Sequence, residues 1–248
     1  MTTPWISIVV PAYNEEVRLK ESLRKIDAYL RERQVSCEIV VVDDGSSDRT
    51  ADIATAYASN CVEHCSVRVL INERNRGKGY SVRRGMLEAR GIYALLTDAD
   101  LSSPIDELPK LEEYVVNQAY DVAIGSRDVP GSAVEIHQSW MRENAGRVFN
   151  RIVRLSTGLP FWDTQCGFKL FKMGTCKEVF RKQRLERFAF DVEVLYIASK
   201  WGLQIAEVPV VWRHAEGSKV RLFPDAPLTG LDLLKIRLSD VRGLYDSV

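Results

Sequence analysis

Asp98 and Asp100 stand one residue apart, directly after a short apolar run that ends at Leu96. Carboxylate oxygens are preferred ligands of Mg²⁺ and Mn²⁺, and such an ion can bridge two carboxylates to substrate phosphates. There it would neutralise a departing diphosphate. Acidic pairs also close turns or cap helices, so the pair alone is a weak signal. Its position after a predicted buried strand strengthens the case for a Mg²⁺ or Mn²⁺ site formed by Asp98 and Asp100.

A second acidic group, Asp43 and Asp44, follows another apolar run and precedes Gly45 and Ser46. A carboxylate there can accept hydrogen bonds from a nucleotide base or ribose, while the glycine permits a turn. Asp44 or Ser46 could instead cap the next helix, with Asp48 capping it further. We expect both interpretations to hold, with Asp43 and Asp44 divided between ligand and cap.

Lys78 lies between Gly77 and Gly79 and could approach a phosphate closely. The spacing matches neither a P-loop nor a dinucleotide fingerprint, and a plain helix-entry turn is an equally good interpretation. The chain has no Gly-x-Ser-x-Gly and no His-Glu-x-x-His, and its three histidines are scattered. These absences argue against the common hydrolase and zinc-protease sites.

The elements that must position these residues alternate in type along the first half of the chain. Short β-branched runs predict buried strands, and the segments between them have helical spacing. This order predicts a doubly wound, mostly parallel α/β sheet with helices on both faces, whose ligands bind beyond the carboxyl ends of the strands. The predicted strands are Ile6–Val10, Ile39–Val42, Val67–Ile71, Tyr93–Leu96 and Val122–Ile124, and the predicted helices are Glu15–Arg33, Ser47–Ser59, Gly79–Arg90, Ile105–Asn117 and Trp140–Ser156.

The bulk properties are those of an ordinary globular enzyme. The 248 residues carry 34 basic and 34 acidic side chains, which removes any global electrostatic argument for nucleic-acid binding. Five cysteines, at no zinc-like spacing, predict a reduced cytosolic protein. No segment has the length and apolarity of a membrane span or the order of a signal peptide, so we expect a cytoplasmic protein that neither crosses a membrane nor is exported.

Three segments, Val9–Glu15, Val42–Asp48 and Asp98–Asp100, together resemble the family 2 glycosyltransferases with the GT-A fold. Within that superfamily, five further segments resemble the dolichyl-phosphate β-glucosyltransferases, which are close relatives of the dolichyl-phosphate mannose synthases. These are Asn75–Gly79, Gly125–Arg127, Asp163–Phe171, Phe190–Ala198 and Glu216–Lys219. The resemblance covers nearly the whole chain. It implies a single GT-A domain with a nucleotide-sugar-binding half, 1–126, and an acceptor-binding half, 127–248.

The resemblance implies an inverting transfer of a hexose, glucose from UDP-glucose, to a polyprenyl or dolichyl phosphate. A phosphate nucleophile is already ionised near neutral pH, so positioning and charge stabilisation suffice. The donor-binding candidates are Pro11, Tyr13, Glu15, Asp43, Asp44, Lys78, Asp98, Ala99 and Asp100. The candidates for the acceptor phosphate are Arg127, Arg142, Gln165, Ser218 and Lys219, and the catalytic candidates are Asp98, Asp100, Arg127 and Asp191.

Arg127 and Arg142 are candidates because a guanidinium grips phosphate with two parallel hydrogen bonds, although either could form a surface ion pair instead. Asp191 and Glu193 stand between base and scaffold. A base would be needed by the alternative enzyme, a family 2 glycosyltransferase acting on a sugar hydroxyl in polysaccharide or glycolipid synthesis. A non-catalytic nucleotide-sugar binding module is a further alternative, and the intact Asp98 and Asp100 pair argues against it.

Two stripes of apolar residues in the second half predict peripheral contact with a membrane. One is flanked by arginines, and the other lies on an amphipathic C-terminal helix with its own basic residues. The eukaryotic enzymes of the resembling group carry an N-terminal membrane anchor, whereas this sequence starts at the first predicted strand, which leaves the route to the lipid open. Each stripe could instead simply pack on the sheet. The stripes are Ala145, Val148, Phe149, Ile152 and Leu155, and Leu231, Leu234, Leu238, Val241 and Tyr245.

Overall fold

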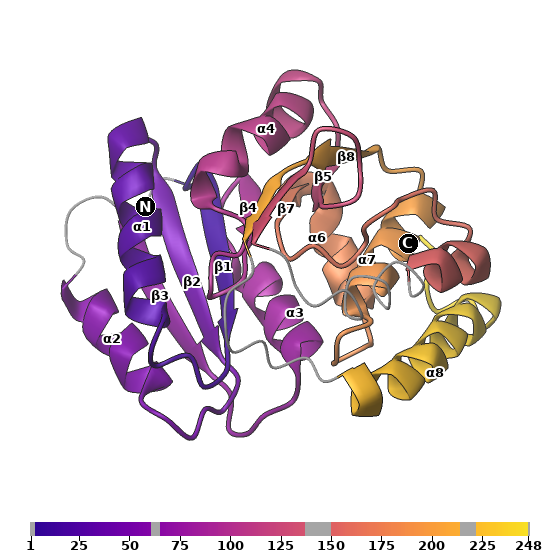
Figure 1. The fold of residues 1–248 in the computed structure, drawn as a ribbon, viewed down its shortest axis with the longest axis horizontal. Helices are drawn as coiled ribbons and strands as arrows, with labels where there is room; N and C mark the ends of the chain where they lie inside the picture. The colour runs from indigo at the N-terminus through magenta and orange to yellow at the C-terminus, as the bar shows by residue number, and fades with distance from the viewer. Residues whose placement is uncertain (1–2, 61–64, 137–149, 214–221, 248) are drawn as a thin grey trace.

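The computed structural model describes residues 3–60, 65–136, 150–213 and 222–247. A seven-stranded sheet in the order β3-β2-β1-β4-β7-β5-β8 runs through the molecule, with helices on both faces (Figure 1). All its strands are parallel except β7, which runs antiparallel to both neighbours. The strands are β1 (Ile6–Ala12), β2 (Cys37–Asp43), β3 (Cys65–Ile71), β4 (Tyr93–Leu96), β5 (Val122–Ser126), β7 (Lys169–Lys172) and β8 (Ile205–Pro209).

The predicted mostly parallel, doubly wound sheet is confirmed, and each of the five predicted strands is present. β1 and β2 are buried along their whole length because helices cover both of their faces. The prediction of burial was wrong for β3, whose side chains after Cys65 are partly or largely exposed. β3 forms the edge of the sheet and pairs only with β2 among the described strands.

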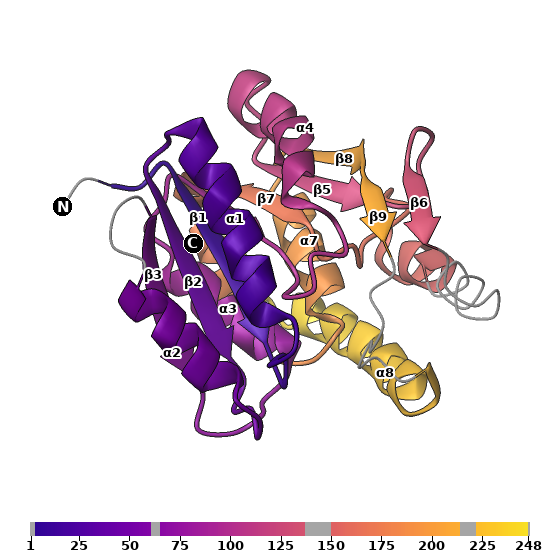
Figure 2. The same cartoon turned by 60° about the vertical axis from the view of Figure 1, so that its left-hand side comes forward.

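Alternate residues of the strands pack into two cores, one on each face of the sheet. One core receives α1 (Leu19–Arg33), α2 (Thr50–Asn60) and α4 (Leu108–Glu112), and the other receives α3 (Lys78–Glu88), α6 (Met173–Lys182), α7 (Phe190–Lys200) and α8 (Leu222–Val241). Figure 2 shows α1 and α2 in front of β1 and β2, with α3 behind them.

The predicted helices are present with shifted ends. α1 begins four residues later than expected, because residues 15–18 form a turn tied to the segment before α2. The helix expected over Ile105–Asn117 is a 3-10 turn (Ile105–Glu107), α4 and a π turn (Glu113–Asn117) in succession, and Pro104 precedes it as expected. Of the helix expected from Trp140, residues 150–157 are helical, and the segment before residue 150 lies outside the described residues.

The second half of the chain completes the sheet and adds a small one beside it. β6 (Ala133–Ile136) pairs in parallel with β9 (Val211–Arg213), at the end where β5 and β8 emerge. β7 inserts between β4 and β5, so residues from both halves of the chain alternate in the order of strands. α8 packs through Leu233 and Ile236 against the core that also contains α6 and α7.

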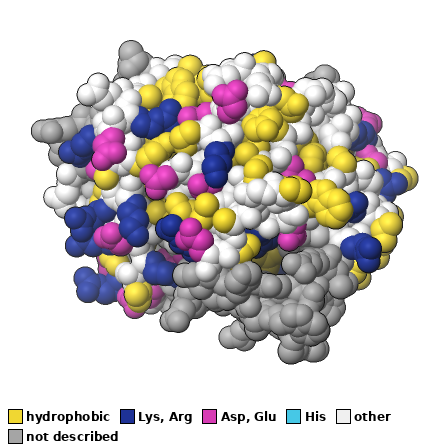
Figure 3. Space-filling model, turned by 45° about the horizontal axis from the view of Figure 1, so that its top comes forward, with side chains coloured by type: hydrophobic (Ala, Val, Ile, Leu, Met, Phe, Trp, Pro, Cys, Tyr) yellow, Lys and Arg dark blue, Asp and Glu magenta, His cyan; other side chains and the backbone are white. Residues whose placement is uncertain are grey.

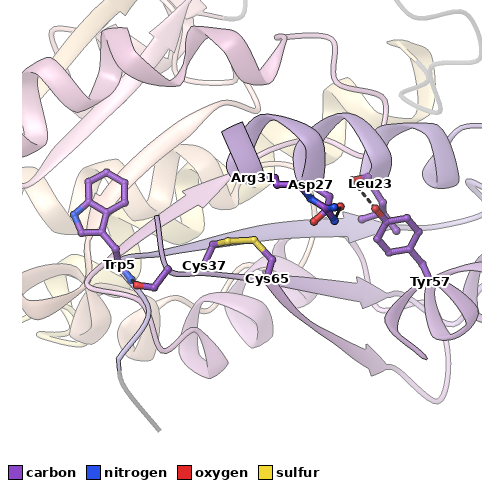
Figure 4. The surroundings of a disulfide bond; sticks show 8 residues. Trp5, Leu23, Asp27, Arg31, Cys37, Tyr57 and Cys65 are labelled. Atoms are coloured by element: carbon purple, nitrogen blue, oxygen red, sulfur yellow. Dashed lines mark hydrogen bonds and ion pairs between the residues drawn. A yellow bond between two sulfur atoms is a disulfide. The ribbon is translucent and has the colours of Figure 1, made fainter. Parts of the chain in front are cut away.

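A disulfide joins Cys37 and Cys65, which corrects the expectation that all cysteines are reduced. The two residues begin the paired strands β2 and β3 and stand opposite each other in their register, with Cα atoms 4.8 Å apart (Figure 4). Cys166 and Cys176 are free and buried, and burial raises the pKa of the Cys176 thiol to about 12.

The surface carries both charges in mixture. On the face in Figure 3, the coloured lysines and arginines are interspersed with aspartates and glutamates, in keeping with equal numbers of the two kinds in the sequence. Within the part of the chain that the structure describes, we find no helix with the length and hydropathy needed to cross a bilayer.

Candidate active site

The candidate site lies where the direction of strand succession reverses, between β1 and β4. The sheet runs from β1 outward to β2 and β3 on one side and to β4 on the other, and ligands of such sheets bind in the crevice beyond this point. Asp98 and Asp100 follow β4, while Tyr13 and Glu15 follow β1, so both segments leave the sheet at the same edge. The expected convergence of polar strand ends is confirmed.

Both carboxylates of the Asp98 and Asp100 pair face cations. The Lys78 ammonium lies 2.6 Å from Asp98 Oδ1, and an Arg18 guanidinium nitrogen lies 3.9 Å from Asp100 Oδ2. Asp100 also accepts a hydrogen bond from the Ser102 backbone N–H at 2.9 Å. Desolvation lowers the pKa of Lys78, but the charge of Asp98, with those of Asp191 and Asp100, outweighs it and the pKa is raised.

Asp44 holds the turn that carries Lys78. Its carboxylate accepts hydrogen bonds from the backbone N–H groups of Arg76 at 3.0 Å and Gly77 at 2.7 Å, and from the Asn72 amide at 2.8 Å. Asp44 therefore does not cap α2, which was one of the two interpretations of the sequence. It instead fixes the entry to α3, whose N-cap residue is Gly77.

Asp43 accepts hydrogen bonds from the N–H of Ser46 at 3.1 Å and from its hydroxyl at 2.5 Å, which closes the turn after β2. The expected cap by Asp48 is confirmed, since its carboxylate accepts from the N–H and hydroxyl of Thr50, the first residue of α2. Asp43 is also buried. Asp43 and Asp44 therefore both make hydrogen bonds that stabilise the local fold, in addition to any role in ligand binding.

The remaining donor candidates surround this turn. Pro11 is buried within β1, Ala99 is buried between the two aspartates, and Tyr13 is the exposed one, at 37% of its surface. Glu15 forms an ion pair with Arg18 at 2.6 Å. Arg18 therefore joins the segment after β1 to Asp100 after β4.

Arg127 forms a bidentate ion pair with the fully buried Asp163. Its Nε and Nη2 donate to the two carboxylate oxygens at 2.6 and 2.8 Å, and its backbone N–H adds a third bond at 3.1 Å. Desolvation opposes the charge of Asp163, but the neighbouring guanidinium outweighs it and holds the pKa below its usual range. Gln165 is part of the same turn, since its backbone N–H donates to Asp163 at 3.2 Å.

Asp191 is buried at the start of α7 and accepts a hydrogen bond from Lys169 Nζ at 2.5 Å. Burial raises its pKa, against the opposing effects of Lys169 and Lys78. Glu193 points elsewhere: it accepts hydrogen bonds from the backbone N–H groups of Arg184 and Leu185 and from the Tyr245 hydroxyl. Of the two acidic residues left open between base and scaffold, Glu193 has a scaffold role and Asp191 lies beside the site.

Four residues near the site were absent from our sequence-based candidates: Arg18, Asp163, Gly167 and Lys169. Lys169 donates to the Cys166 carbonyl as well as to Asp191, and so fixes the turn around Gly167. A methyl group on Gly167 would lie only 2.5 Å from the carboxylate carbon of Asp98. The signal available in the sequence was the pair of charged residues, Asp163 and Lys169, each next to large apolar residues.

The chemistry of the Asp98 and Asp100 pair fits a divalent metal with oxygen ligands. Among the described residues, no group of three or more histidine, cysteine or acidic side chains could hold a metal by itself. Two carboxylates therefore suit an ion that takes its other ligands from a diphosphate and water. The candidates Arg142, Ser218 and Lys219, and all three histidines, lie outside the described residues.

The model of the family described as "Glycosyl transferase family 2" matches residues 7–180. The chain is 35% identical to the dolichyl-phosphate beta-glucosyltransferase of Dictyostelium discoideum, over 97% of this chain and 76% of that one. It is 37% identical to the human dolichyl-phosphate beta-glucosyltransferase, over 98% of this chain and 78% of the relative.

Solved structures share the fold at low sequence identity. Mannosyl-3-phosphoglycerate synthase from Rubrobacter xylanophilus matches with a TM-score of 0.72 at 18% identity, covering 99% of this chain and 77% of that one. Glucosyl-3-phosphoglycerate synthase from Mycobacterium tuberculosis, solved in complex with Mn²⁺, UDP and glucosyl-3-phosphoglycerate, matches with a TM-score of 0.68 at 18% identity, covering 95% and 79%. The expected GT-A fold is thereby confirmed. With its Asp98 and Asp100 pair at the switch point and its match over most of its length, the chain belongs to glycosyltransferase family 2, in the group of the dolichyl-phosphate β-glucosyltransferases.

Proposed function

We propose that this enzyme transfers glucose from UDP-glucose to a dolichyl or related polyprenyl phosphate, with inversion at the anomeric carbon and with Mg²⁺ or Mn²⁺. The observation that carries the proposal is the Asp98 and Asp100 pair at the β1/β4 switch point, with Lys78 beside it. The names of relatives more than 30% identical over nearly the whole chain support the sugar and the lipid.

In this reaction an oxygen of the acceptor phosphate bonds to the anomeric carbon as the bond from that carbon to UDP breaks. The negative charge moves to the departing diphosphate, and a divalent ion bound there would neutralise part of it. Asp98 and Asp100 would hold this ion at the diphosphate end of the donor, and Lys78 donates to a diphosphate oxygen. Asp43 and Asp44 bind on the uridine side, next to Tyr13.

The acceptor phosphate binds at Arg127, on our proposal, because this guanidinium is oriented and fixed. Asp163 holds Nε and Nη2, which leaves Nη1 directed away from the pair, and the Arg127 side chain keeps 29% of its surface exposed. Arg142, Gln165, Ser218 and Lys219 remain candidates for the same phosphate.

A phosphate acceptor requires no base, and the surroundings of Asp191 agree with that. Its carboxylate is engaged by Lys169 at 2.5 Å in a buried ion pair. A base that must take a proton from a sugar hydroxyl would have to give up this ion pair during turnover. Asp191 therefore acts, on this proposal, as a fixed negative charge beside Lys78, and the hydroxyl-acceptor alternative loses support.

A direct assay tests the proposal. Purified protein with Mn²⁺ and UDP-glucose should release UDP when a short polyprenyl phosphate is added, and should release far less with the corresponding polyprenol. A donor screen with UDP-galactose, UDP-N-acetylglucosamine and GDP-mannose checks the sugar. Release with the polyprenol but not with its phosphate would refute the acceptor assignment.

We further propose that the enzyme works at the cytoplasmic face of a membrane, through an exposed apolar stripe on α8. Leu231, Leu234, Leu238 and Val241 expose between 55% and 83% of their surface and repeat at helical spacing. Lys235, Arg237 and Arg242 lie beside them and can meet lipid phosphates. Tyr245, which the sequence placed in this stripe, is buried instead, because its hydroxyl bonds to Glu193.

The other predicted stripe contributes on the same side of the molecule. Figures 1 and 2 both place helix 150–157 on the side where α8 lies. Ile152 and Leu155 on this helix are 49% and 83% exposed, and the neighbouring Trp162 is 53% exposed. Arg154 stacks on the Trp162 ring at 4.2 Å. Ala145, Val148 and Phe149 lie outside the described residues.

Liposome co-sedimentation tests this contact. The wild type should sediment with anionic vesicles, more strongly at low salt, and Leu234→Asp/Leu238→Asp should stay in solution while keeping the wild-type fold. Leu155→Asp tests the second stripe separately. If the wild type stays in solution at both salt concentrations while transfer to the lipid phosphate persists, another route delivers the acceptor.

A further inference from the structure

Each carboxylate of the Asp98 and Asp100 pair already has a positive partner supplied by the chain. Lys78 contacts Asp98 directly, at 2.6 Å, and Arg18 lies 3.9 Å from Asp100. Neither contact lies deep in the protein, since the four side chains keep between 21% and 33% of their surface exposed. Asp98 is therefore paired with a cation at close range, yet remains partly exposed to solvent.

The backbone that carries Lys78 is fixed on two sides. Asp44 accepts from the N–H groups of Arg76 and Gly77, and the carbonyls of Glu186 and Leu185 lie where side chains on Gly77 and Gly79 would stand, 2.5 and 2.6 Å from the added carbon. Lys78 itself ends in a flexible four-carbon stem with a compact ammonium. The backbone of Lys78 is therefore held in place, whereas its ammonium group can move from one anionic partner to another nearby.

A divalent cation that approached Asp98 would meet this ammonium first. It would have to displace Lys78 or bind close to the positive charges of both Lys78 and Arg18. The described residues supply no third acidic, histidine or cysteine ligand that would compensate for this repulsion. A diphosphate changes this balance because it brings its own negative charges and oxygen ligands. It also gives the displaced ammonium a new partner.

We propose that Lys78 is a resident counter-cation of Asp98 that prevents tight metal binding until a nucleoside diphosphate arrives. This inference rests on the proposed function. When the donor enters, the Lys78 ammonium leaves Asp98 for an oxygen of the diphosphate, and the freed carboxylate becomes a metal ligand. When UDP departs, Lys78 returns to Asp98 and weakens the hold on the metal, which links product release to metal release.

Mn²⁺ binding to the full chain, measured by calorimetry with and without UDP, tests the proposal without an activity readout. The wild type should bind Mn²⁺ at least tenfold more tightly when UDP is present. Lys78→Met should bind Mn²⁺ alone at least tenfold more tightly than the wild type, or about 1.4 kcal/mol. The same variant should bind UDP less tightly in the presence of Mn²⁺, because the diphosphate has lost its lysine.

Arg76→Met is the matched control. Arg76 lies in the same turn and carries the same charge, but its guanidinium pairs with Glu186 and stacks on Tyr80 at 3.7 Å. Its removal should leave the affinity for Mn²⁺ alone unchanged. If Arg76→Met tightens Mn²⁺ binding as much as Lys78→Met does, the effect belongs to the general charge of the turn and the proposal is wrong.

Two further results would also overturn it. One is a Lys78→Met protein that binds Mn²⁺ no better than the wild type. The other is a wild type that binds Mn²⁺ equally well with and without UDP, which needs no variant and therefore does not depend on how Lys78→Met folds. Failure of every protein to bind Mn²⁺ even with UDP would overturn the proposed metal-dependent function as well, and so separates the two conclusions.

Discussion

Replacing Gly167 by alanine should disable the site while leaving the fold intact. The added methyl carbon would lie 2.5 Å from the carboxylate carbon of Asp98, where ordinary contacts begin near 3.4 Å. The Asp98 carboxylate must therefore retreat by at least about 0.9 Å, because its Oδ2 lies nearer still to the added carbon, and its 2.6 Å contact with Lys78 has to change with it. Because Asp98 is the end of a flexible side chain, the retreat costs little stability.

The expected loss of activity follows from the size of that displacement. A misplacement of about 1 Å at a reacting centre can lower a rate by about 100-fold, which corresponds to roughly 2.7 kcal/mol in the activation barrier. We therefore expect Gly167→Ala to lower the rate of transfer from UDP-glucose to a short polyprenyl phosphate by about that factor. The unfolding temperature, followed by circular dichroism, should stay near that of the wild type.

Gly174→Ala is the matched control. Gly174 lies in the first turn of α6, and an added carbon there meets nothing within 4 Å. The control should keep wild-type transfer and gain up to about 1 kcal/mol of stability, because alanine favours a helix over glycine. Wild-type transfer by Gly167→Ala would refute the argument that Gly167 positions Asp98.

Four further predictions concern the pairs described above. Asp100→Ala should lose at least about 100-fold in transfer while unfolding at the wild-type temperature, and full activity of this variant in EDTA would exclude the metal assignment. Arg127→Ala leaves the buried Asp163 without its cation, so chemical denaturation should show a free energy of unfolding lower by about 3 kcal/mol. The rate of transfer to the lipid phosphate should fall by a larger factor than the affinity for UDP-glucose measured by calorimetry. Equal losses in rate and affinity would move Arg127 to the donor side. Because the pKa of Asp163 is lowered, its ion pair stabilises the fold fully above the usual carboxyl pKa and ceases to do so as the pH falls through the lowered pKa. The difference in unfolding free energy between wild type and Asp163→Asn should therefore become smaller in acid. A difference that does not depend on pH would contradict this. Cys37→Ala/Cys65→Ala should lower the free energy of unfolding by about 3–4 kcal/mol. The rate of transfer should not change, since the disulfide joins the first residues of β2 and β3 and the site lies beyond the other ends of the strands. An unchanged free energy of unfolding would show that the cross-link does not stabilise the fold.

The strands of the first half could be predicted from sequence because their apolar, β-branched runs are long enough to stand out. β7 could not, because Lys169–Lys172 is a four-residue strand with a lysine at each end, and only its two neighbours in the sheet make it a strand. The exposure of β3 likewise depends on sheet order, because its Val, Leu and Ile residues resemble those of a buried strand.

The acidic residues of the site could be predicted from the sequence, but the residues that contact and position them could not. Asp98 and Asp100 stand in a short motif after a recognisable strand. The partners of Asp98 come from distant parts of the sequence, since Lys78 begins α3 and Gly167 precedes β7, and their meeting depends on the tertiary fold. The disulfide was not predicted for the same reason, because Cys37 and Cys65 are separated by 28 positions and become neighbours only through the register of β2 and β3.

The antiparallel direction of β7 has a consequence for how the enzyme can move. Because β7 runs against its neighbours, the chain enters it at the edge where the parallel strands end, and this brings Gly167 to Asp98. The same strand is hydrogen-bonded to β4 on one side and to β5 on the other, so strands from residues 1–126 and from residues 127–248 share one continuous hydrogen-bonded ladder. No hinge can open between two lobes without breaking that ladder. Movements that admit ligands are therefore expected in the loops beyond the carboxyl ends of the strands and not between the two halves of the chain.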